Sequence, residues 1–117
     1  MIPTPSIPAP YVAGSVTLPA GTPQNLLTLI QQQITPNCPA SAVELQLWAD
    51  AANSGSIIVG AASTLHGSLS DTNYAYKLTP TATPRVYRST YPGQSVPLGD
   101  LQVLSINGGS LRLELWT

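Results

Sequence analysis

The stretch LRLELW, Leu111 to Trp116, decides the fold of this chain. Side chains alternate between the two faces of a strand, so three leucines would share one face and a tryptophan would share the other with two charged residues. The same pattern recurs in VELQLW, Val43 to Trp48. We therefore predict two half-buried strands, each of which ends in an outward tryptophan.

Short alternating segments separated by Gly, Pro and Asn fill the chain from Ala42 onward. AANSG at 51–55 is typical of a tight turn between VELQLWAD and SIIVG, and NGG at 107–109 precedes the final strand. Almost no helical periodicity interrupts them. This pattern predicts an all-β fold, an antiparallel sandwich or small barrel of jelly-roll-like type, with roughly seven to nine strands.

One helix is predicted near the N-terminus. Thr22 followed by Pro23 is a typical helix start, and four apolar residues follow at helical spacing up to Pro36. These residues are Leu26, Leu27, Ile30 and Ile34. An extended conformation of NLLTLI, 25–30, stays open because its alternation is ambiguous.

Residues 1–13 form a predicted extended arm, and residues 14–117 a single β-sandwich domain. Prolines in the arm fix φ and disfavour helix in the residues before them. The arm lies either on a neighbouring subunit or back on its own domain, and both alternatives remain open. Its expected contact residues are Ile2, Pro3, Pro5, Ile7, Pro8, Pro10 and Tyr11.

The chain is unusually poor in charge. Only 8% of its 117 residues are charged, against about 25% in typical soluble domains. We therefore expect other subunits to cover part of its surface. No basic run predicts binding to nucleic acid, and no apolar segment approaches the roughly 20 residues that span a bilayer.

Candidate residues for catalysis or metal binding are few. His66 and Cys38 are each the single residue of their type, so we predict neither a metal site nor a cofactor. Ser63, His66 and Asp71 occur along one loop and would be the residues of a hydrolase. A solvated polar loop explains them better, and we predict that the chain is not an enzyme.

Aromatic residues are the best candidates for binding. Trp48 and Trp116 are expected to contact a partner chain or the arm, because exposed indoles among few charges favour association. A second group would form a ligand loop for sugars or a partner, unless the rings cap the core. Its members are Tyr74, Tyr76, Tyr87 and Tyr91.

The order of these segments resembles small β-rich bacteriophage virion proteins. The resemblance rests on LQLWADAANSGSIIVG (45–60), YPGQSVPL (91–98), DLQVLSI (100–106) and NGGSLRLELW (107–116). It covers about half of the chain. The first 40 residues have no counterpart in the pattern, and residues 61–90 are longer than the pattern allows.

The resemblance implies a structural protein located in the virion. Its expected role is capsid decoration, with the major capsid protein and sister copies as partners and a trimer as one expected form. The alternative is a tail or fibre module that binds a cell-surface glycan through its tyrosine-rich loop. The resemblance carries over no catalytic residues.

Overall fold

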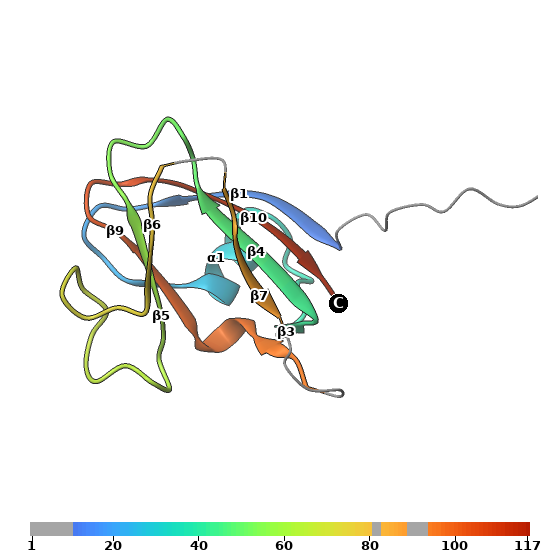
Figure 1. The fold of residues 1–117 in the computed structure, drawn as a ribbon. Coiled ribbons are helices and arrows are strands. Elements are labelled where there is room, and N and C mark those ends of the chain that lie inside the picture. The colour runs from blue at the N-terminus through green and yellow to red at the C-terminus, as the bar shows by residue number, and fades with distance from the viewer. Residues whose placement is uncertain (1–10, 81–82, 89–93) are drawn as a thin grey trace, which may run out of the picture.

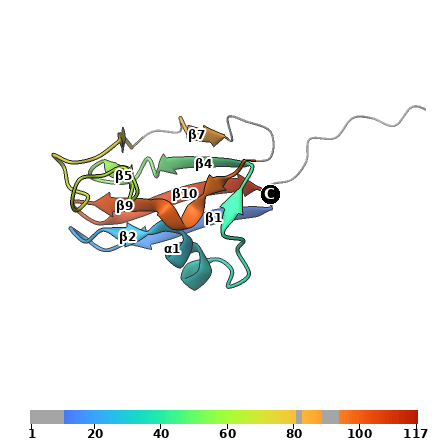
Figure 2. The same ribbon diagram turned by 90° about the horizontal axis from the view of Figure 1, so that it is seen from below.

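Two antiparallel four-stranded sheets pack face to face in the computed structural model (Figures 1 and 2). The structure describes residues 11–80, 83–88 and 94–117. The first sheet has the order β1-β10-β4-β7 and carries both tryptophans, so we call it the Trp sheet. The second has the order β2-β9-β5-β6, and we call it the covered sheet because a loop lies over it.

The strands of the two sheets come from distant parts of the chain. The Trp sheet consists of β1 (Val12–Leu18), β10 (Gly109–Trp116), β4 (Glu44–Ala49) and β7 (Arg85–Arg88). The covered sheet consists of β2 (Gln24–Asn25), β9 (Leu101–Ser105), β5 (Ile57–Ala61) and β6 (Tyr76–Leu78). A small ladder joins β3 (Ser41–Ala42) to β8 (Val96–Pro97), and the 3₁₀ turn η1 (Leu98–Asp100) precedes β9.

The strand order is that of a jelly roll. When β3 and β8 are set aside, the eight remaining strands run first-eighth-third-sixth in one sheet and second-seventh-fourth-fifth in the other. This is the double Greek-key arrangement of two packed sheets. The all-β prediction is confirmed, and of its two forms the structure has the sandwich.

The alternating pattern places the core where the sequence predicted it, except that Val43, expected on the side of Leu45 and Leu47, precedes β4 and is 56% exposed. Leu45 and Leu47 on β4 pair with Leu115 and Leu113 on β10, and all four are at most 1% exposed. The covered sheet contributes Ile57, Val59 and Val103 from the opposite side. Apolar side chains from both inner faces therefore form one continuous core.

The single helix, α1 (Leu26–Gln33), begins later than predicted. Asn25 is its N-cap, because the Asn25 side chain accepts a hydrogen bond from the Thr28 amide at 3.1 Å. The predicted start at Thr22 and Pro23 is wrong, since β2 intervenes. The buried residues of the helix are Leu26, Leu29 and Ile30.

The N-terminal strand starts inside the predicted arm. β1 begins at Val12, which is buried and pairs with Leu115. Tyr11 immediately before it is 60% exposed. The other arm residues, Ile2, Pro3, Pro5, Ile7, Pro8 and Pro10, lie outside the described part of the chain.

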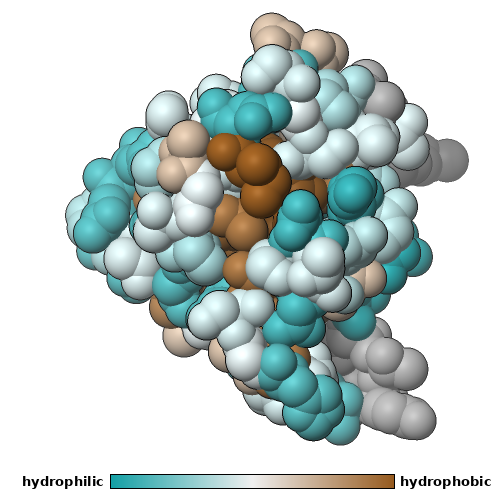
Figure 3. All heavy atoms as spheres, turned by 90° about the vertical axis from the view of Figure 1, so that its left-hand side faces the viewer, coloured by the Kyte–Doolittle hydropathy of each residue, from teal (hydrophilic) through white to brown (hydrophobic). Residues whose placement is uncertain are grey.

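The loop between β5 and β6 covers the outer face of the covered sheet. Leu69 and Leu65 from this loop pack against Ile58 and Leu104. Gly60 allows the loop to approach, because a Cβ there would lie 2.7 Å from a methyl carbon of Leu65. Apolar surface on the side of β5, β6 and β9 is reduced to a narrow band between hydrophilic side chains (Figure 3).

Candidate interaction surfaces

The outer face of the Trp sheet carries both tryptophans, each half-buried. Trp48 pairs across the strands with Arg112, whose guanidinium lies 5.8 Å from the indole ring centre. A cation over an indole face is attracted by the ring's electron distribution. This contact explains why a tryptophan occupies the same face as charged residues.

The two tryptophans do not form one patch. Trp116 pairs with Glu44 at the far end of the sheet, four positions along β10 from the partner of Trp48. At about 3.4 Å per residue this separates them by roughly 14 Å. They share a face, as the sequence predicted, but a partner would have to cover most of the sheet to contact both.

The charged residues on this face are Glu44, Arg88, Arg112 and Glu114. Within the described residues the structure records one ion pair, in which Arg88 Nε lies 2.5 Å from Glu44 Oε1. The Arg88 side chain is 71% exposed. Such surface pairs contribute about 0–1 kcal/mol to stability. The ion pair therefore contributes little to the stability of the sheet.

Two of the candidate tyrosines meet at the edge of the sandwich between β6 and β7. The guanidinium of Arg85 lies 4.4 Å from the ring centre of Tyr76 and 5.4 Å from that of Tyr87. Burial raises the pKa of Tyr87, and its interaction with Arg85 partly opposes the rise. Arg85 thus links the two sheets at this edge.

The other tyrosines are not gathered into this cluster. Tyr74 contacts the Lys77 ammonium, 5.4 Å from the ring centre, and Tyr91 lies outside the described residues. Tyr76 lines a hollow of about 290 Å³, and Tyr87 lines a different one of about 310 Å³. The sequence could not reveal Arg85 as the residue that joins Tyr76 to Tyr87.

Of the three residues that would form a hydrolase, Ser63 bonds Asp100 and not His66 or Asp71. The Ser63 hydroxyl donates to a carboxylate oxygen of Asp100, and the Ser63 amide donates to the other at 2.8 Å. Asn73 Nδ2 donates to the carbonyls of His66 and Ser68 at 3.1 and 2.9 Å. These bonds shape the loop that covers the second sheet.

Among the described residues, no group of three or more His, Cys, Asp and Glu side chains is placed to hold a metal ion. Cys38 is buried, and burial raises the pKa of its thiol. The described helix is too short to cross a bilayer.

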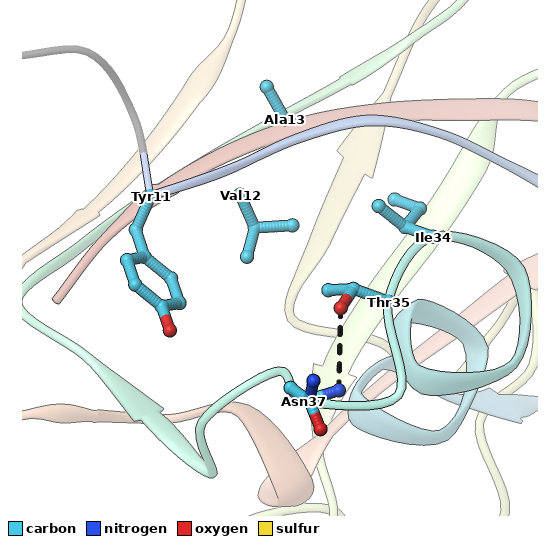
Figure 4. Close-up of a pocket in the computed structure, with 6 residues that line it drawn as sticks. All are labelled: Tyr11, Val12, Ala13, Ile34, Thr35 and Asn37. Atoms are coloured by element: carbon cyan, nitrogen blue, oxygen red, sulfur yellow. Dashed lines mark hydrogen bonds between the residues drawn. The ribbon is translucent and has the colours of Figure 1, made fainter.

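The N-terminal segment leaves the domain beside a groove of about 340 Å³. The groove lies between the start of β1 and the turn after α1 (Figure 4). The Tyr11 amide donates to the Leu115 carbonyl at 2.8 Å, which fixes the backbone at this point. The lining residues are Tyr11, Val12, Ala13, Ile34, Thr35 and Asn37.

Comparison with known proteins finds no relative of this chain. No family model matches the chain, and neither curated proteins nor solved structures give a significant match. The resemblance to phage virion proteins therefore rests on the sequence pattern alone.

Proposed function

We propose that the chain is a structural virion protein that decorates a capsid. In this proposal it binds the major capsid protein and sister copies, and its N-terminal segment is the principal attachment element. The observation that carries the proposal is the root of that segment, which is fixed at the edge of the Trp sheet beside an open groove.

The geometry of the root supports an attachment role. Val12 is buried and β1 is paired along its length with β10, so the described domain has its own core without residues 1–10. Ten extended residues span up to about 33–36 Å. A segment of that length is long enough to contact a neighbouring subunit while its root stays fixed.

The composition of the surface supports association with other proteins. The chain carries four basic and five acidic residues, so few charges oppose contact between copies. Among the described residues, Tyr11, Val43, Val86 and Ile106 are large apolar side chains more than a third exposed. Burying such apolar surface at an interface contributes about 25 cal/mol per Å² to the free energy of association before entropic costs are subtracted.

The fold is compatible with this role but does not select it. Jelly rolls occur in viral capsid proteins and also in lectins and cupins. Function depends on the site, not on the fold. The fold therefore supports the decoration proposal and the glycan-binding alternative equally.

The attachment role can be tested with a truncation guided by the structure. Residues 1–10 are removed, Tyr11 and Val12 are kept, and binding to particles of the major capsid protein from the same genome is measured by co-sedimentation. We expect loss of binding with an unchanged melting temperature. A matched control replaces residues 1–10 with ten Gly and Ser residues and should also fail to bind. Normal binding by either variant would reject the proposal.

The alternative, a tail or fibre module that binds a glycan, is favoured by the exposure of Tyr74 and Tyr76, at 40% and 39%. Aromatic rings at a surface can stack on sugars. One face of each ring already has a cation near it, which leaves the other face for a ligand. A glycan array would support this alternative if Tyr76→Ala abolished a signal that Tyr11→Ala retained.

A further inference from the structure

Among the described residues, no hydrogen-bond partner is recorded for the outward backbone groups of Ala13 and Ser15 on the outer edge of β1. Gln33 bonds the backbone of Thr17 on this edge, where the Thr17 amide donates to Oε1 at 2.7 Å and Nε2 donates to the Thr17 carbonyl at 3.0 Å. Backbone groups alternate in direction along a strand, so those of Ala13 and Ser15 point to the same edge as those of Thr17. The Gln33 amide caps the edge at one end only.

The free edge adjoins the side chain of Ile34. Gly14 lies between the two free residues, and a Cβ at Gly14 would lie 3.2 Å from the Ile34 side chain. In Figure 4, Val12 points into the groove while Ala13 points away from it. A strand added to this edge would therefore have backbone partners at Ala13 and Ser15 and an apolar contact beside Gly14.

The N-terminal sequence suits such an edge. Residues 2–5 and 7–10 repeat the pattern Ile-Pro-x-Pro. In an extended segment with proline at every second position, all missing amides lie on one side and all remaining amides on the other. Residues 2–6 have amides at Ile2, Thr4 and Ser6, so such a strand can pair on one side and not on the other.

We propose that residues 2–6 of a second copy add as an antiparallel strand to the free edge of β1. Pairing two residues with Ala13 and Ser15 uses either Ile2 and Thr4 or Thr4 and Ser6. Thr4 bonds β1 in both registers, and Pro3 or Pro5 lies opposite Gly14 over Ile34. This inference deepens the proposed function, because it names the contact between sister copies.

The sequence favours a second copy over the same chain as the donor. To return to its own β1, the segment would have to reverse within residues 7–10. Ile7 and Ala9 each precede a proline, which disfavours the αR conformation that a turn without Gly or Asn would need. Residues 7–10 instead continue from the fixed root at Tyr11 and act as a spacer.

The proline-bearing side of the added strand would also limit growth. A free strand edge normally invites further pairing and aggregation. Here the new outer edge would lack amides at Pro3 and Pro5, so no further strand can bond there regularly. Growth of the sheet at this edge would therefore stop at the added strand.

The test uses the full chain and two variants at one position. Thr4→Pro removes the shared amide, whereas Thr4→Ala changes the side chain and keeps the amide. Sedimentation velocity should show that the parent chain and Thr4→Ala associate with rising concentration, while Thr4→Pro stays monomeric. Residue 4 lies outside the described domain, so equal melting temperatures of the monomers should exclude unfolding as the cause.

Hydrogen exchange locates the contact. The amides of Ala13 and Ser15 should exchange more slowly as the parent chain associates, and this slowing should disappear in Thr4→Pro. Association of Thr4→Pro as strong as that of the parent would overturn the inference. So would a parent chain that stays monomeric, including one whose edge is protected by its own segment. Capsid binding is measured in a separate experiment, so a failure to bind capsids would not change how the self-association data are interpreted.

Discussion

The two sheets leave two sides open between them, and the chain closes these sides by different means. On the side of β1 and β2, α1 inserts Leu26, Leu29 and Ile30 into the core. On the side of β7 and β6, the Arg85 guanidinium lies between the rings of Tyr76 and Tyr87. The first closure is apolar and buried, and the second is a polar contact at the surface.

This difference indicates where the stability of the sandwich lies. Buried aliphatic side chains contribute several times more than an exposed cation–π contact. The β6–β7 side should therefore open at lower cost than the helix side. The four predictions below test this ranking.

Leu26→Ala should have the largest effect. Leu26 is a fully buried residue of α1, so truncation of its side chain leaves a cavity and should lower the free energy of unfolding by roughly 2–5 kcal/mol. Urea denaturation measures the loss. Leu27→Ala is the control, because Leu27 is only partly buried and should cost clearly less. Equal costs for both variants would contradict the view that the helix closes this side by deep burial.

Gln33→Ala should cause the second-largest loss of stability. It removes two hydrogen bonds to Thr17 and should cost about 1–2 kcal/mol in all. Gln32→Ala is the matched control, since its neighbouring exposed side chain has no such contact with β1. Thermal melts compare the two, and faster exchange at the Thr17 amide should occur only in Gln33→Ala. Identical melts would show that the cap is unimportant.

Arg85→Gln should cost less, about 0.5–1 kcal/mol, as expected for exposed cation–π contacts. Arg85→Lys keeps the charge but loses the flat guanidinium, so it should restore only part of the stability. Denaturant midpoints measure both variants. A loss as large as that of Leu26→Ala would reverse the proposed ranking of the two sides.

The smallest effect should come from ionisation of Tyr87. Burial raises the pKa of Tyr87 in the folded chain. The neutral phenol therefore contributes its full stabilisation below the unfolded-state pKa of about 10, and this stabilisation is lost as pH rises through the folded-state pKa. Stability should decline slightly more at alkaline pH in the parent than in Tyr87→Phe. Ultraviolet titration of tyrosinate checks the assignment. A lowered pKa would contradict it.

The sequence predicted the elements that follow simple periodicity and missed those that depend on distant contacts. Alternation identified the core leucines of β4 and β10 and the outward direction of Trp48 and Trp116. The helix start was misplaced, because Asn25 serves as its cap only when β2 pairs with β9. A two-residue strand leaves too weak a local pattern to be recognised.

The candidate surfaces show the same division. The sequence predicted a ligand loop with Tyr74, Tyr76, Tyr87 and Tyr91, but not that Arg85 would contact two of these rings or that Lys77 would lie over a third. The loop at 61–75 looked polar throughout, although Leu65 and Leu69 anchor it to the sheet. The contact of Arg85 with Tyr76 and those of Leu65 and Leu69 with the sheet join segments far apart in the sequence, which local patterns do not encode.

The position of β10 has a consequence for how the protein is made. Residues 109–116 leave the ribosome after every other strand, yet they form the centre of a sheet between β1 and β4. During synthesis, β1 and β4 have no partner between them. Until β10 pairs, β1 and β4 each present an edge of unpaired backbone N–H and C=O groups, which can pair wrongly with another chain. Pairing of β10 therefore joins β1 to the rest of the Trp sheet and removes both edges in one step.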